Sequence, residues 1–173
     1  MSPAVVLIGM PGAGKSSVGH ALASALGVPF ADSDDLVVAA TGRSIADLFA
    51  ESEAAFRAAE AAAVTRALAT FDGVLALGGG ALLSAAVREA LAASPVPVVL
   101  LRAGLDTLLA RVGDAADRPL LVADPVARLA TLAAERDALY DAAADVVVET
   151  DGRTVAEVAE LVQAATIGQE VRP

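Results

Sequence analysis

The stretch AVVLIGMPGAGKSS, residues 4–17, decides the fold class, because an apolar run leads directly into a glycine-rich turn. The apolar run has the length and composition of a buried strand. The turn satisfies the spacing G-x-x-x-x-G-K-[ST] from Gly9 to Ser16, and a helical pattern follows through Leu26. Strand, glycine-rich turn and helix, in this order, are the context that a phosphate-binding loop requires.

Such a loop binds phosphate because glycines let backbone N–H groups turn inward, and the start of the helix adds its positive end. Lys15 would reach the terminal phosphates of a nucleotide, and the hydroxyl of Ser16 would ligate magnesium. The expected nucleotide-binding residues are Gly12, Ala13, Gly14, Lys15, Ser16 and Ser17. A glycine-rich turn that binds nothing is the alternative, but the motif favours ATP or GTP and leaves the acceptor open.

Composition narrows the possible partners. The 173 residues suit a single domain, 1–173, and a formal net charge of −10 disfavours binding to nucleic acid or to anionic membranes. Cysteine is absent, which excludes disulfides and thiolate metal sites. The first apolar run is too short for a membrane span or a secretory signal. We therefore expect a cytoplasmic protein, and we expect it to be a monomer.

Apolar runs alternate with amphipathic, Ala- and Leu-rich segments along the whole chain. The runs that resemble buried strands are 4–8, 28–31, 74–77, 96–101 and 146–148. Strand then helix, repeated five times, predicts an α/β three-layer sandwich around a central five-stranded parallel sheet. The segment 113–125 is the only long irregular stretch between these elements, and we expect a mobile lid over about 112–125.

Carboxylates follow the second apolar run, in Asp32-Ser33-Asp34. If the strand continued through them, Asp32 and Asp34 would point to the same side, where one would support magnesium and the other a hydroxyl. The alternative is that Ser33 or Asp34 caps the next helix. Asp151 follows the last run and is a second candidate for the metal, but with Gly152 it is typical of a turn.

Two arginines point to an anionic acceptor. Arg136 lies within the apolar stripe Leu129, Leu132, Ala133, Leu139 and Tyr140 of a helix expected over about 124–142. A guanidinium on such a face needs an anionic partner. Arg57 shares a helix face with Val64 and Leu68, but it also has Glu53 and Glu60 within one turn, so an ordinary helix ion pair stays open.

Taken together, these stretches resemble the shikimate kinases, small P-loop kinases of the nucleoside monophosphate kinase superfamily. The similar stretches are GMPGAGKSSVG, ADSDD with TGRSIADLF, EAAFRAAE, LALGGGA, RPLL and ERDALY. The resemblance covers nearly the whole chain and implies the P-loop kinase fold with a mobile lid, with an acceptor-binding region over about 32–62. It gives no role to His20 or Tyr140.

The resemblance also implies roles for individual residues. Asp34 would bind and orient the acceptor hydroxyl, Asp32 would support magnesium with Ser16, and Arg57 and Arg136 would bind the acceptor carboxylate. The other implied contacts are Gly78, Gly79 and Gly80 with the acceptor ring, Arg118 from the lid with the transferring phosphate, and Arg111 and Arg153 with the adenine. Lys15, Asp34 and Arg118 would be the catalytic residues.

The implied reaction is transfer of the terminal phosphoryl group of ATP to the 3-hydroxyl of shikimate, with magnesium, in the pathway to chorismate and the aromatic amino acids. A kinase of another small carboxylated acceptor, such as gluconate, is the nearest alternative. A nucleoside monophosphate acceptor is disfavoured, because aromatic residues that would stack on a base make up 3% of the chain. From another class, a non-catalytic nucleotide-binding module remains open.

Overall fold

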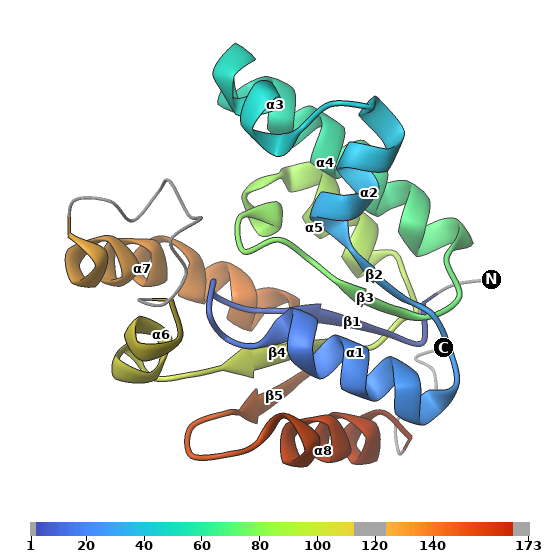
Figure 1. The fold of residues 1–173 in the computed structure, drawn as a ribbon. Helices are drawn as coiled ribbons and strands as arrows, with labels where there is room; N and C mark the ends of the chain where they lie inside the picture. The colour runs from blue at the N-terminus through green and yellow to red at the C-terminus, as the bar shows by residue number, and fades with distance from the viewer. Residues whose placement is uncertain (1–2, 113–123, 168–173) are drawn as a thin grey trace.

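The computed structural model describes residues 3–112 and 124–167 and shows an α/β sandwich (Figure 1). Its strands are β1 (Val5–Ile8), β2 (Phe30–Asp32), β3 (Val74–Ala76), β4 (Val98–Arg102) and β5 (Val146–Glu149). They form one parallel sheet in the order β2-β3-β1-β4-β5. The predicted five-stranded parallel sheet is therefore confirmed.

Two strands begin two residues later than the apolar runs that predict them. Val28 and Val96 pack against the core, yet they precede the first strand residues, Phe30 and Val98. A hydrophobic residue on the approach to a strand can be buried without joining the hydrogen-bonded ladder. Hydrophobicity therefore located these strands correctly but not their first residues.

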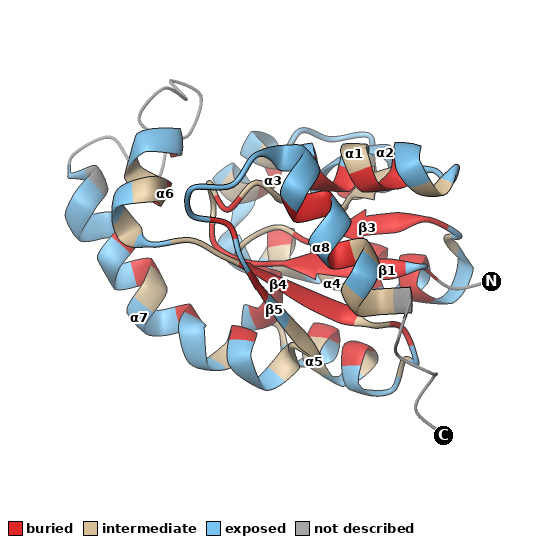
Figure 2. Ribbon diagram, turned by 90° about the horizontal axis from the view of Figure 1, so that it is seen from below, coloured by how far each residue is buried: buried red, intermediate tan, exposed pale blue. Residues whose placement is uncertain are grey.

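Helices cover both faces of the sheet. They are α1 (Lys15–Leu26), α2 (Ser33–Thr41), α3 (Ile45–Glu51), α4 (Glu53–Thr70), α5 (Ala85–Ala92), α6 (Leu105–Val112), α7 (Pro125–Ala143) and α8 (Val155–Ile167), with a short 3₁₀ helix η1 (Ala81–Leu83). On one face α1 packs beside α8, and on the other α5 lies between α4 and α7. The sheet forms the middle layer, in which β1, β3 and β4 are the most buried strands (Figure 2). None of the described helices is long and apolar enough to cross a membrane.

The loop after β1 takes its shape from glycine. Gly12 has φ of 86° and Gly14 has φ of 94°, which is the left-handed region that other residues avoid. Gly14 is also the residue before the first turn of α1, and Lys15 starts that helix. The loop therefore ends at the N-terminus of α1, and the first-turn N–H groups of a helix are suited to bind an anion.

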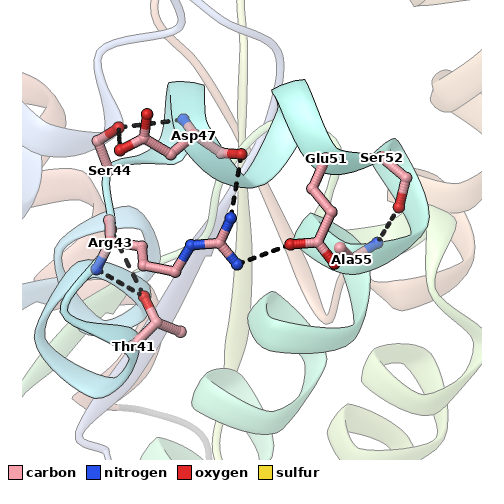
Figure 3. Close-up of polar contacts among 7 residues, drawn as sticks. All are labelled: Thr41, Arg43, Ser44, Asp47, Glu51, Ser52 and Ala55. Atoms are coloured by element: carbon pink, nitrogen blue, oxygen red, sulfur yellow. Dashed lines mark hydrogen bonds and ion pairs between the residues drawn. The ribbon is translucent and has the colours of Figure 1, made fainter.

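A second, smaller cluster of buried residues lies outside the sheet, where α2 and α3 pack against α4. Its buried members are Val37, Leu48, Phe56 and Ala63. Arg43 links the start and the end of α3, because it bonds to Glu51 at 2.8 Å and donates to the carbonyl of Asp47 (Figure 3). Ser52 then caps α4 by accepting from the amide of Ala55. These contacts fix the region that the sequence assigns to the acceptor.

Candidate active site

Parallel strand register brings the carboxyl ends of β1, β2 and β3 to one edge of the sheet. Asp32 on β2 pairs with Ala76 on β3, and Ala76 pairs with Leu7 on β1. The chain leaves all three strands within the next two residues. The phosphate-binding loop, the acidic segment and the glycine run therefore start at the same level.

Lys15 lies over the phosphate-binding loop. Its Nζ donates to the carbonyl oxygens of Gly9 at 2.8 Å and Met10 at 3.0 Å. These bonds hold the Lys15 ammonium group against the glycine-rich loop to which the sequence assigns a phosphate. Ser17, the next predicted phosphate contact, is exposed on the first turn of α1.

Ser16 and Asp32 meet across the loop, 16 residues apart in sequence, with the Ser16 hydroxyl donating to Asp32 Oδ2 at 3.1 Å. The other carboxylate oxygen, Oδ1, accepts from the amide of Asp34 and caps α2. The alternative that Ser33 or Asp34 caps this helix is therefore wrong by one or two residues, since Asp32 is the cap. β2 ends at Asp32, so strand alternation does not explain the position of Asp34.

Asp34 lies in the first turn of α2 and faces the glycine run. Its Oδ1 is 3.1 Å from the position that a Cβ on Gly78 would occupy. Although one side of Asp34 is open to solvent, surrounding protein desolvates the carboxylate and raises its pKa, and the charge of Asp32 raises it further. Lys15 and Arg57 oppose this rise. An aspartate with a raised pKa is a better proton acceptor than an ordinary one.

Arg57 forms the helix ion pair that its sequence neighbours predict, and it also borders the glycine run. Its Nη1 contacts Oε2 of Glu60 at 2.6 Å, and Glu60 is 1% exposed. Burial raises the pKa of Glu60, whereas Arg57 lowers it. A Cβ on Gly80 would lie 2.7 Å from the Arg57 Cζ, so this glycine leaves the room that the guanidinium fills. The sequence spacing predicts Glu60 as an ion-pair partner of Arg57, but it does not predict that Glu60 is buried.

Arg136 is buried on α7 as its place in the apolar stripe predicts, with 8% of its surface exposed. Among the described residues it makes no ion pair with a carboxylate, and its Nε has no hydrogen-bond partner. Leaving a buried guanidinium in this state is unfavourable. An anionic ligand would supply the missing partner.

The glycine run Gly78–Gly80 is enclosed by side chains of the site. Gly78 donates its amide to the buried hydroxyl of Ser33 at 2.8 Å. A Cβ on Gly79 would lie 2.9 Å from the ring of Pro11, in the phosphate-binding loop. The carbonyl of Gly79 accepts from the hydroxyl of Tyr140 at 2.5 Å. Sequence reasoning missed Ser33 and Tyr140 as members of the site because both contacts join distant segments.

The predicted adenine side shows a different arrangement. Arg111 donates to the carbonyls of Gly12 and Ala13 and to both oxygens of Thr150, so it lies between the loop and the end of β5. Asp151 accepts from the amide of Gly104 in the turn that the sequence predicts, which leaves it no part in the Ser16 and Asp32 pair.

The remaining predictions here concern Arg153 and the lid. Arg153 is exposed between β5 and α8. Arg118 and nearly all of the predicted lid, 112–125, lie outside the described residues. The roles of these residues stay predictions.

Known proteins match this chain over most of its length. The family model described as shikimate kinase matches residues 11–166. A curated shikimate kinase from Frankia casuarinae is 49% identical, covering 93% of this chain and 71% of its own length. One from Salinispora tropica is 48% identical, covering 92% and 95%.

The fold matches as well. A solved shikimate kinase from Acinetobacter baumannii in complex with shikimate superposes with a TM-score of 0.90 at 33% identity, covering 99% of this chain and 96% of that one. The family model, the curated relatives and the superposed fold agree over most of the chain, and this chain is therefore a member of the shikimate kinase family.

Proposed function

We propose that this protein transfers the terminal phosphoryl group of ATP to the 3-hydroxyl of shikimate, giving shikimate 3-phosphate and ADP. The observation that carries the proposal is Arg136, a buried guanidinium that has no carboxylate partner in the described part of the chain and lies on the acceptor side. Membership of the shikimate kinase family supports a carboxylated acceptor there.

The acceptor would be bound between α7 and α4. Arg136 and Arg57 would bind its carboxylate, because a planar guanidinium matches both oxygens of that group. The segment Gly78–Gly80 would contact the ring through its backbone. Asp34 would accept a hydrogen bond from the 3-hydroxyl and so aim its oxygen at the donor phosphate.

In the reaction the 3-hydroxyl oxygen forms a bond to the γ-phosphorus while the bond from that phosphorus to the β–γ bridging oxygen breaks. The hydroxyl proton passes to Asp34, whose raised pKa favours that transfer. Lys15 and the loop amides would neutralise charge on the leaving ADP. Arg118 is proposed to do the same on the transferring group, and Arg111 and Arg153 are proposed to border the adenine.

A magnesium ion fits the donor set that Ser16 and Asp32 provide, because hydroxyl and carboxylate oxygens are the ligands it prefers. Within the described residues there is no cluster of three or more acidic or histidine side chains able to hold a metal alone. The ion would therefore arrive with the nucleotide and complete its coordination with phosphate oxygens and water. When bound, it would neutralise charge on the phosphates.

A coupled ADP-release assay tests the proposal. Wild type would be measured with ATP and magnesium, with and without shikimate, and gluconate would serve as the second carboxylated acceptor. We expect ADP release to require shikimate and to fall to background in Arg136→Ala with subsaturating acceptor. ADP release with gluconate but not with shikimate would identify gluconate as the acceptor. ATP binding without any acceptor-dependent ADP release would indicate a non-catalytic module.

A further inference from the structure

Tyr140 is a buried phenol at the junction of three parts of the site. It lies on α7 four residues after Arg136, so both side chains share one face of the helix. Only 2% of its surface is exposed, and its hydroxyl donates to the carbonyl of Gly79, 61 residues away in sequence. This bond joins α7 directly to the glycine run.

The Arg136 guanidinium lies near the phenol, one helical turn away on the same face of α7. Burial raises the pKa of Tyr140 to about 12, although the positive charge of Arg136 opposes the rise. The hydroxyl therefore keeps its proton at neutral pH. A neutral phenol can donate to Gly79 and still offer its oxygen to the neighbouring guanidinium.

Gly79 is held from a second direction by the phosphate-binding loop. A Cβ on Gly79 would lie 2.9 Å from the Pro11 ring, so the two backbones pack without room for a side chain. Pro11 fixes the position of this peptide relative to the donor side, and Tyr140 fixes it relative to Arg136. A phenol in this place thus links the residue that would bind the carboxylate to the backbone that would contact the ring.

We infer that Tyr140 is a positioning residue for the acceptor: it orients Arg136 and holds the Gly79 peptide so that both meet the same ligand. The inference rests on the proposed function, because it assigns Tyr140 to acceptor binding rather than to the donor. A residue that merely stabilises the fold would affect both substrates alike.

The test is Tyr140→Phe, which removes one hydroxyl and keeps the ring in the core. Thr131→Val is the matched control, because it removes a hydroxyl from an exposed position on the same helix. We expect KM for shikimate to rise about fivefold to tenfold in Tyr140→Phe, the range for one lost buried hydrogen bond, with KM for ATP changed less than about twofold. Thr131→Val should leave both constants at wild-type values.

A double variant separates positioning from independent binding. If Tyr140 acts partly through Arg136, Tyr140→Phe should raise KM for shikimate by a smaller factor in an Arg136→Ala background than in wild type, because only the contact with Gly79 is then lost. Equal effects in the two backgrounds would overturn the link to Arg136. Parallel rises in KM for shikimate and ATP, with a lower melting temperature, would show a structural role only and overturn the inference.

A measurement without substrate keeps this inference separate from the proposed function. In NMR spectra of the free protein, Tyr140→Phe should shift the Gly80 amide, which shares its peptide bond with the Gly79 carbonyl, and the Arg136 Nε–H signal. Unmoved signals would overturn the inference even if wild type phosphorylates shikimate. Shifted signals in a protein without shikimate-dependent activity would keep Tyr140 as the link between these groups and refute the proposed acceptor.

Discussion

The proposed site has a donor side, made of the phosphate-binding loop and Asp32, and an acceptor side, made of Arg57, Glu60, Arg136 and Gly78–Gly80. The two sides differ in how their polar groups are satisfied. On the donor side, Lys15 bonds to two loop carbonyls and Ser16 bonds to Asp32. On the acceptor side lie all three buried side-chain atoms that lack a hydrogen-bond partner in the described residues, which are Arg57 Nε, Glu60 Oε1 and Arg136 Nε. Among the described residues the donor side thus leaves no buried side-chain atom without a hydrogen-bond partner, whereas the acceptor side retains unmet hydrogen-bonding capacity.

This difference indicates which side of the site determines substrate specificity. A loop that binds phosphate mainly through backbone N–H groups recognises a feature that all nucleotides share. Buried atoms without a hydrogen-bond partner favour a ligand that completes them and disfavour analogues that do not, because each unsatisfied atom carries a desolvation cost. The acceptor side should therefore distinguish substrates more sharply than the donor side.

The largest effect is expected at Lys15. Lys15→Ala removes the cation that we propose beside the phosphates of ATP, and kcat should fall about a thousandfold because charge developing on the leaving group would lose its main stabiliser. Coupled ADP release under saturating shikimate measures this, and circular dichroism with thermal melting verifies the fold. A fall in kcat of less than about tenfold would mean that the loop amides alone stabilise most of the charge on the leaving group.

Asp34→Asn should lower kcat about a hundredfold, since the hydroxyl loses its proton acceptor. It should also stabilise the protein at neutral pH. Because the folded-state pKa is raised above the unfolded value, the ionised carboxylate opposes folding, and this penalty disappears below about pH 4, where both states are protonated.

Urea unfolding of wild type and Asp34→Asn at several pH values measures this linkage. Asp35→Asn is the matched control, because its side chain is exposed beside Asp34. We expect the stability difference between Asp34→Asn and wild type to shrink as the pH falls. A difference that grows toward low pH would contradict the sign of the pKa shift.

Arg136→Lys keeps the charge but loses the planar pair of donors. KM for shikimate should rise about thirtyfold, the equivalent of one charge-assisted hydrogen bond, with KM for ATP unchanged. Arg128→Lys, exposed on the same helix, is the control and should match wild type. If lysine served as well as arginine at position 136, the acceptor would be recognised by charge and not by geometry.

Ser16→Ala tests the magnesium site that we propose at Ser16 and Asp32. Loss of the hydroxyl should raise the magnesium concentration for half-maximal activity about tenfold, while KM for shikimate at saturating magnesium stays near wild type. Ser24→Ala, exposed on α1, is the control. An unchanged magnesium requirement would remove Ser16 from the metal site.

The smallest effect is expected for Gly80→Ala. The new methyl group would lie within 2.7 Å of the Arg57 Cζ, so the guanidinium must move. Because that group is the end of a flexible side chain, the melting temperature should change little, while KM for shikimate should rise about threefold. A large loss of stability instead would mean that Arg57 is a structural ion pair with Glu60 and no more.

Local pattern was enough to predict much of this site. The spacing from Gly9 to Ser16 fixed the loop, and α1 ends at Leu26 where the helical pattern ends. The apolar stripe around Arg136 predicted its burial, because helical period and burial are linked. The position of Asp34 was harder, since the strand ends at Asp32 and the helix begins at Ser33. The Asp32 side chain caps α2, so the alternation of side chains along a strand does not extend to Asp34.

By itself, the sequence determined the alternation of strands and helices, the phosphate-binding loop and the unusual arginine on an apolar face. These features depend on hydrogen bonds and periodicities within a few residues. Only the tertiary structure decided the strand order β2-β3-β1-β4-β5, the Ser16 contact with Asp32 and the bond from Tyr140 to Gly79. Such contacts join segments far apart in the chain, and they exist only once the sheet has brought those segments to one edge.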